Sequence, residues 1–195
     1  MTVHGNIAGI SRYHLQQLDE LNQNIIPRHL VCDSETAYVL SSLTAAISRE
    51  ILLYVDRRGN VLYVAVGDSD TVAMVDISKR RSQERLSGIR CIHTHPKSSG
   101  QLSDADLTAL VSLRLDCMLA IGVQEDGQPG SCGLAWGVLA ESRPMNLLYR
   151  NIQQLEKIDV TAAFAEIEKA AQMAAATATK ANGPIKAILV GLWQK

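Results

Sequence analysis

Apolar residues in the first third of the chain are spaced as in helices. Residues 11–22 have the pattern of a short polar helix, and residues 34–50 that of a second one. We predict Ser34 to be the N-cap of the second helix, because a hydroxyl there can accept a hydrogen bond from a free backbone N–H. The apolar positions of this helix are Ala37, Leu40, Leu43 and Ile47.

The next segments have the composition of β-strands. Residues 51–55 (ILLYV) and 61–66 (VLYVAV) are dense in β-branched and aromatic residues, and the turn DRRGN separates them. Such a pair predicts a β-hairpin. Residues 72–77 (VAMVDI) predict a further strand, and the polar, basic residues 78–85 predict an exposed loop.

The second half of the chain continues to alternate between strands and helices. Residues 89–95 (IRCIHTH) predict a buried strand, and a helix is expected to begin at Ser103. Residues 117–123 and 131–139 predict two strands joined by the turn QEDGQPG. Residues 146–180 have a helical, Ala-rich pattern that ANGP ends, and a last strand, IKAILVGLW, follows.

This order of elements predicts an α/β domain, a mixed β-sheet sandwiched by helices. We assign residues 1–145 to that domain and residues 146–181 to a long helix or linker. Residues 182–195 are expected to begin a further domain.

Composition and charge narrow the function classes. Apolar residues make up 47% of the 195 residues and charged residues 20%, as in ordinary globular proteins. The formal net charge of −1 gives no general attraction to anionic membranes or to DNA, so we expect no membrane association and no sequence-specific DNA binding. No apolar run is long enough to span a bilayer, and the start of the chain has no signal-peptide pattern.

The cysteines indicate a reducing compartment. Cys32, Cys91, Cys117 and Cys132 are scattered and form no C-x-x-C pair. Single cysteines in strand-like segments are typical of small buried core residues. A cytoplasmic location is the simplest interpretation.

One segment carries candidate metal chemistry. It reads H-x-H, seven residues, then S-x-x-D, and its titratable residues are His93, His95 and Asp106. Residues two apart on a strand point to the same side, so the two imidazoles can reach one ion. A carboxylate from Asp106, one turn into the next helix, supplies a third ligand. Two nitrogens and one oxygen leave the fourth position of zinc open, as catalytic zinc requires.

A structural alternative exists for part of this motif. The sequence S-x-x-[DE] before an apolar helix is also a capping box, in which Ser103 and Asp106 only tie the start of the helix. A single strand histidine is likewise more often structural than a ligand. The full combination at this interval is far rarer by chance than its parts, and it favours a metal site.

The motif resembles the JAMM (MPN-type, cytidine-deaminase-like) metallo-isopeptidases over about residues 34–140, including the proline after the second histidine. The resemblance implies that His93, His95 and Asp106 bind zinc. It implies that Ser103 helps to hold the reacting oxygen and that an upstream glutamate activates the water. Glu50, at the start of the predicted strand 51–55, matches that glutamate.

The position of the glutamate leaves alternatives. Glu50 can also be a solvated carboxylate at a helix end, and Glu35 is the second candidate for the base, although it lies at the other end of the helix. The bulky residues 51–53 stand where the deubiquitinase branch has small ones. The sequence is therefore more similar to the divergent bacterial branch that includes RadC-like proteins.

Other segments resemble a different protein. Residues 4–27, the hairpin and the final KAILVGL are similar to the N-terminal region of long-form HflX, a ribosome-associated GTPase whose opening domain also has H-T-H followed by S-x-x-D-L-T. The resemblance implies that GTP binding belongs to a domain outside this chain and that a ribosome is a candidate partner. The basic residues Lys79, Arg80, Arg81 and Arg85 could contact RNA, although a solvated loop is the simpler interpretation.

Two functions follow from these patterns: a zinc-dependent amide or isopeptide hydrolase, or a non-catalytic ribosome- or protein-binding module with a relic or structural metal site. Neither includes GTP binding, because no G-x-x-x-x-G-K-[ST] phosphate loop occurs in the chain. We therefore expect no binding of GTP by this chain at micromolar concentration. Isothermal titration calorimetry measures this directly, and a micromolar dissociation constant would contradict it.

Overall fold

The computed structural model describes most of the first 139 residues and one later strand. Residues 138–139 and 185–193 are described by their backbone. The described ranges are 3–72, 74–75, 77, 86–96, 99–139 and 185–193.

Seven strands form one mixed sheet in the order β1-β3-β2-β4-β5-β6-β7. The pairs β1–β3 and β4–β5 are parallel, and the other neighbours are antiparallel. Among the described residues the elements follow the chain as β1 (Val3–Gly5), α1 (Arg12–Glu20), the 3-10 turn η1 (Leu21–Gln23), α2 (Ser34–Ile47), β2 (Ile51–Asp56), β3 (Val61–Val66), β4 (Ile89–Pro96), α3 (Asp104–Ser112), β5 (Cys117–Val123), β6 (Pro129–Leu139) and β7 (Ile185–Trp193).

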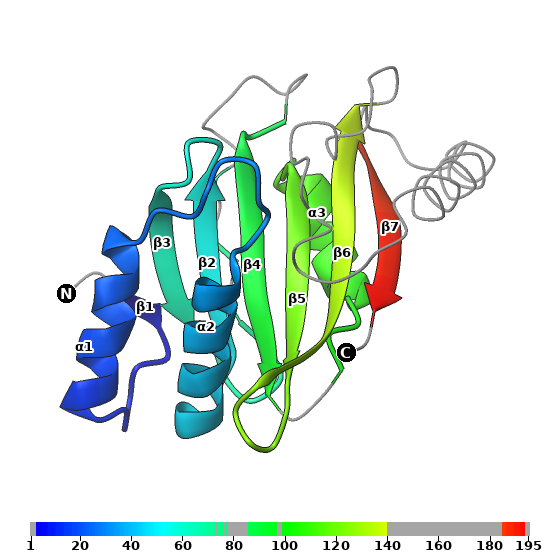
Figure 1. Cartoon of the computed structure of the whole chain (residues 1–195). Helices are drawn as coiled ribbons and strands as arrows, with labels where there is room; N and C mark the ends of the chain where they lie inside the picture. Colours follow the sequence, from blue (N-terminus) through cyan, green and yellow to red (C-terminus); the bar gives the residue numbers. More distant parts are fainter. Residues whose placement is uncertain are drawn as a thin grey trace.

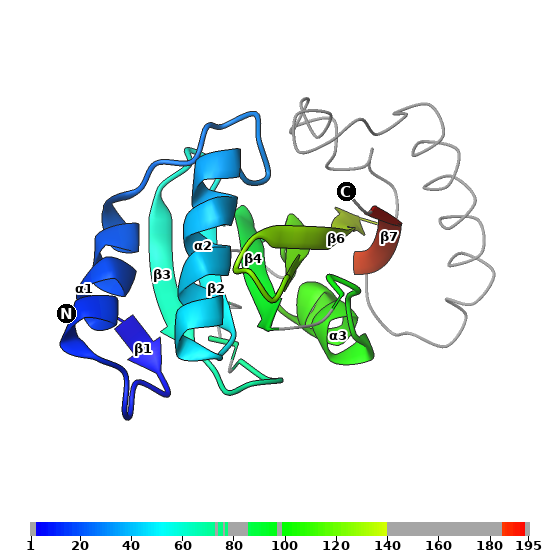
Figure 2. The same cartoon turned by 60° about the horizontal axis from the view of Figure 1, so that its bottom comes forward.

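Helices cover both faces of the sheet. In Figure 1, α1 and α2 lie in front of the sheet and α3 lies behind it, and the turned view in Figure 2 places them in the same two layers. The general prediction of an α/β fold with a mixed sheet between helices is confirmed. The more specific JAMM-type fold stays a prediction.

Alternate residues of each central strand belong to different cores. On β2, Leu53 packs with α1 and α2 in one buried cluster, whereas Leu52 packs with α3 residues in a second cluster. The same alternation on β4 places Ile92 on the α2 side and Cys91 on the α3 side. A residue's side of the sheet therefore follows from its position along the strand.

The core around β5 should be sensitive to truncation. Leu119 is fully buried in the cluster under α1 and α2. We expect Leu119→Ala to lower the free energy of unfolding by about 2–5 kcal/mol, because it removes buried methyl groups and leaves a cavity. Denaturant unfolding measures the change, with Val39→Ala on the exposed side of α2 as the control expected to stay within about 0.5 kcal/mol. A loss below about 1 kcal/mol for Leu119→Ala would contradict the packing.

The ends of α2 explain how the chain enters β2. Asp33, and not Ser34 as predicted, is the N-cap, since its carboxylate accepts a hydrogen bond from the Thr36 N–H at 2.9 Å. Asp33 and Ser34 can both cap a helix, and Asp33 is the one that has the extended backbone conformation of an N-cap residue. At the other end Ser48 adopts the left-handed conformation with φ of 54°, which stops the helix two residues before Glu50.

The strand predicted at residues 72–77 is wrong at every described position. Residues 72, 74, 75 and 77 form no strand. Their apolar side chains instead pack on the cluster on the α3 side, and the Tyr54 hydroxyl contacts Met74 Sδ at 3.5 Å. A segment that covers a core has the same apolar composition as a strand, so composition alone could not separate the two.

Several other predictions have clear outcomes. The hairpin of β2 and β3, the helix at 11–22 and the strand at the C-terminal end are confirmed. All four cysteines are free and buried, as expected. β7 pairs with β6 at the sheet edge, while the assignment of residues 182–195 to a further domain stays a prediction. The helix predicted at 146–180 and the basic cluster at 79–85 lie outside the described residues.

Candidate metal centre

The two histidines are held by the middle of the sheet. His93 pairs with Leu52 of β2 on one side and with Ala120 of β5 on the other. Because His93 and His95 are two residues apart on β4, both side chains emerge on the α3 side. The side chain of His93 is 1% exposed and that of His95 is 14% exposed, so one imidazole is buried and the other reaches solvent.

Asp106 reaches the histidines from the first turn of α3. Its Oδ2 accepts hydrogen bonds from the Ser103 N–H and hydroxyl, each at 2.8 Å, and Ser103 Oγ accepts from the Asp106 N–H at 3.2 Å. The predicted capping box is therefore present. The other oxygen, Oδ1, lies 3.3 Å from His93 Nε2. One carboxylate thus caps the helix and faces the imidazoles, so the two interpretations of this motif are compatible.

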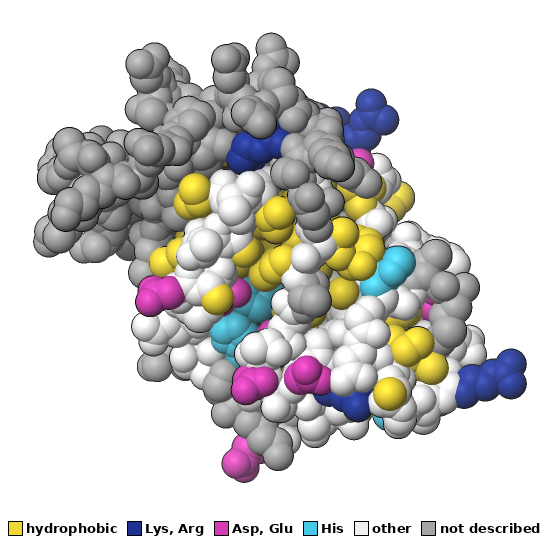
Figure 3. All heavy atoms as spheres, turned by 180° about the vertical axis from the view of Figure 1, so that it is seen from behind, with side chains coloured by type: hydrophobic (Ala, Val, Ile, Leu, Met, Phe, Trp, Pro, Cys, Tyr) yellow, Lys and Arg dark blue, Asp and Glu magenta, His cyan; other side chains and the backbone are white. Residues whose placement is uncertain are grey.

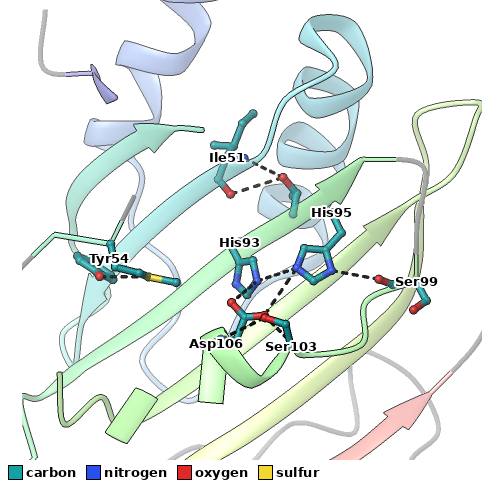
Figure 4. A network of polar contacts seen from close by, with 9 residues as sticks. Ile51, Tyr54, His93, His95, Ser99, Ser103 and Asp106 are labelled. Carbon is teal, nitrogen blue, oxygen red and sulfur yellow. Dashed lines mark hydrogen bonds and ion pairs between the residues drawn. The ribbon is translucent and has the colours of Figure 1, made fainter. Parts of the chain in front are cut away.

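The donor atoms have spacings suited to one metal ion (Figure 4). The Nε2 atoms of the two histidines are 2.9 Å apart. His93 Nε2 lies 3.3 Å from Asp106 Oδ1, and His95 Nε2 lies 3.9 Å from Asp106 Oδ2. A zinc ion about 2.0–2.1 Å from each of two ligands at the tetrahedral angle separates them by roughly 3.4 Å. The observed values bracket that separation, and His93, His95 and Asp106 form a group that could hold a metal ion.

Hydrogen bonding prepares His95 as a ligand. Its Nδ1 lies 3.1 Å from the Ser99 carbonyl oxygen, which can only accept, so Nδ1 carries the proton. In the neutral ring this leaves the Nε2 lone pair directed at the other two residues. His93 Nδ1 is buried and has no hydrogen-bond partner among the described residues.

The charge states also suit a cation. Burial raises the pKa of Asp106, but the hydrogen bond and positive charge of His93 and the hydrogen bonds from Ser103 outweigh burial and hold the pKa below its usual value. Burial and the neighbouring His93 lower the pKa of His95. At neutral pH these shifts favour an ionised Asp106 and a neutral His95, the forms in which these two residues bind a metal.

Glu50 lies on the same side of the sheet, immediately before β2. It is 6% exposed and lines a cavity of about 440 Å³ together with His95 and Asp106. Burial, opposed in part by His93, raises the pKa of its carboxyl to about 7. Glu35, the second candidate for the base, is exposed in the first turn of α2, the helix on the opposite face.

The raised pKa has a consequence for stability. The folded state holds the proton of Glu50 up to about pH 7, whereas the unfolded chain releases it near 4.5. The stability that the Glu50 proton contributes to the metal-free protein is therefore lost as pH rises from 4.5 to 7. We expect Glu50→Gln to raise the unfolding free energy on the order of 1–3 kcal/mol at pH 8 and to change it little at pH 4. Urea unfolding at both values checks this, and an equal effect at both would contradict it.

The sequence did not identify the part of the cavity lining that follows β3. This part comprises Ser69, Asp70, Thr71, Val72 and Met74. Gly67 permits it, since a Cβ there would lie 2.0 Å from the Thr71 carbonyl oxygen. A glycine followed by small polar residues and an apolar run was the available signal. Figure 3 shows this side of the molecule, where histidine side chains reach the surface beside acidic and apolar ones.

Comparisons with known proteins give no independent assignment. No family model matches the chain, and no curated protein matches it. Among the residues that the structure describes, no helix combines the length and apolar character needed to cross a membrane.

Proposed function

We propose that this chain is a zinc-dependent hydrolase of amide or isopeptide bonds, similar in mechanism to the JAMM class. One observation carries the proposal: two imidazole nitrogens and a carboxylate converge beside a cavity that also contains a buried glutamate with a pKa near 7. A structural zinc site has four protein ligands, whereas this group supplies three. The remaining position suits a water or a substrate oxygen.

The residues have separate tasks in this mechanism. Zinc, when bound, supplies the Lewis acidity that makes water a nucleophile near neutral pH. Glu50 accepts the proton of the attacking water and returns it to the leaving amine, as a base with a pKa near the working pH does well. Asp106 contributes negative charge. Ser103 is the proposed donor to the developing oxyanion, and to donate it must turn its hydroxyl hydrogen away from Asp106 Oδ2.

The test combines metal content with turnover. Protein purified without chelator is expected to contain about one zinc per chain by elemental analysis. It should hydrolyse members of a panel of peptide and isopeptide substrates, lose that activity with a chelator, and regain it with added zinc. Zinc-loaded protein that hydrolyses none of the panel would reject the hydrolase.

One observation favours a second function. Ser103 and one oxygen of Asp106 are already engaged in the capping box, as expected if the motif now serves structure. In that case the chain is a non-catalytic module, and the resemblance to HflX makes the ribosome its candidate partner. Co-sedimentation with ribosomes tests this, and binding that survives removal of zinc and the Glu50→Gln substitution would support the module over the enzyme.

A further inference from the structure

The ladder between β2 and β4 ends beside the proposed metal centre. Leu52 and His93 are the last paired residues on that side. Ile51, one residue nearer to Glu50, still pairs with Val66 of β3 but has no backbone partner on β4. The two strands therefore part at the point where Glu50 and His95 face the cavity.

Beyond the last backbone pair, the side chain of Thr94 on β4 forms the hydrogen bond to β2. Thr94 lies between the two histidines, and its hydroxyl faces the opposite side of the sheet, toward α2. Thr94 Oγ1 accepts a hydrogen bond from the Ile51 N–H at 3.0 Å and lies 2.6 Å from the hydroxyl oxygen of Thr44 on α2. Both threonines are buried, so water cannot replace these bonds. Figure 4 shows the contacts to Ile51.

The backbone of Glu50 is held from the other direction. Its N–H donates to the Asp68 carbonyl oxygen at 2.8 Å, and its own carbonyl oxygen accepts from the Gly67 N–H at 2.9 Å. These bonds tie Glu50 to the end of β3, which carries no metal ligand. Beyond the last ladder pair, the Thr94 hydroxyl ties this segment to the strand of the histidines: it accepts from the Ile51 N–H and lies 3.5 Å from the Ile51 carbonyl oxygen, to which it can donate.

We infer that Thr94 is a positioning residue that sets the placement of Glu50 relative to His93 and His95. The inference rests on the proposed function. The Thr94 hydroxyl holds the Ile51 N–H, and with it the adjacent Glu50, at a fixed position along β4. His93 and His95 are the residues bonded to Thr94 on either side, so their backbone positions are fixed by the same residue. A single residue thus links the proton acceptor to two of the three metal ligands.

The test uses three substitutions, of which one removes the hydrogen bond from the Ile51 N–H and two keep it. Thr94→Val keeps the shape of the side chain but leaves the Ile51 N–H without an acceptor. Thr94→Ser keeps the hydroxyl. Thr44→Val, the matched control, removes the other buried hydroxyl and leaves Thr94 free to accept from Ile51. If Thr94→Val does not fold, Thr94→Ala takes its place.

We expect Thr94→Val to lower kcat roughly 10–100-fold, as displacement of a reacting group does, with KM and zinc content unchanged. Thr94→Ser should restore kcat to within about threefold, and Thr44→Val should change it by less than that. In a Glu50→Gln background Thr94→Val should have no further effect, because its role acts through Glu50. An unchanged kcat, a loss of zinc, or a full additional loss in that background would each overturn the inference.

A second measurement does not depend on turnover. Hydrogen exchange of the Ile51 amide in zinc-loaded protein should be faster in Thr94→Val by at least about tenfold and nearly unchanged in Thr44→Val. If the wild type hydrolyses nothing, the proposed function fails and this exchange alone decides whether Thr94 holds the segment. Slow exchange in Thr94→Val would then overturn the positioning.

Discussion

Substituting Glu50→Gln is expected to leave zinc content intact and to lower amide hydrolysis by about 10²–10⁴-fold, the usual contribution of a positioned acid–base group. Glutamine preserves the shape of the side chain but cannot accept a proton. Because Glu50 lines the cavity and is not one of the three candidate ligands, its loss should not release the metal. Steady-state kinetics and elemental analysis of the same preparation measure both quantities.

The matched control is Glu35→Gln, the same chemical change on the opposite face of the sheet. It is expected to retain full activity, because Glu35 is exposed at the start of α2. A fully active Glu50→Gln would show that another group takes the proton. Activity that is lost together with zinc would show that Glu50 binds or orders the metal.

The pH dependence should agree with this role. Only ionised Glu50 can accept a proton, so activity should rise with pH through the pKa of Glu50 and fall below it. That pKa is about 7 without metal, and a bound cation stabilises the carboxylate and lowers it. The acidic limb of kcat should therefore lie at or below pH 7 and should disappear in Glu50→Gln.

The second large effect is loss of the metal. We expect His95→Ala and Asp106→Ala each to lower zinc content from about one per chain to near zero and to abolish chelator-sensitive hydrolysis, since each removes one of three ligands. His29→Ala, which removes an exposed histidine elsewhere, should keep both. Stoichiometric zinc in His95→Ala would disprove the ligand assignment.

Ser103→Ala separates the capping role from the metal role. It removes the hydroxyl that caps α3 but leaves the carboxylate of Asp106 in place. The variant should lose about 0.5–2 kcal/mol of stability and retain zinc. If it loses zinc as completely as Asp106→Ala, the cap and the ligand cannot be separated, and the metal site depends on the position of α3.

The sequence predicted the parts of this site that depend on periodicity. His93 and His95 share a face because a strand repeats every two residues, and Asp106 lies in the first turn because Ser103 caps a helix. These two predictions needed only local rules. Glu50 was named because the resemblance to the JAMM class implies a glutamate between a helix and a strand, and the structure places it in the cavity with His95 and Asp106.

What the sequence could not provide depends on long-range packing. Residues 69–72 and 74 line the cavity, and the apolar Val72 and Met74 pack on the α3 side of the sheet, which their strand-like composition did not predict. The short strand β1 was also missed, since three residues carry too little pattern and pair with β3 from far away in the sequence. The role of the Thr94 hydroxyl could not be predicted, because it depends on the hydrogen bond from the Ile51 N–H, which lies on another strand.

The opposite faces of β4 have a consequence for folding. Its imidazoles face α3 and its threonine hydroxyl faces α2. If β4 shifted by one residue against its neighbours, the threonine would turn toward the cavity and both histidines would be buried under α2. Such a misaligned chain could keep the secondary structure of the native protein but would bind no zinc. Stoichiometric metal uptake therefore reports correct strand alignment, and it can be used to separate native protein from a misfolded product of the same size.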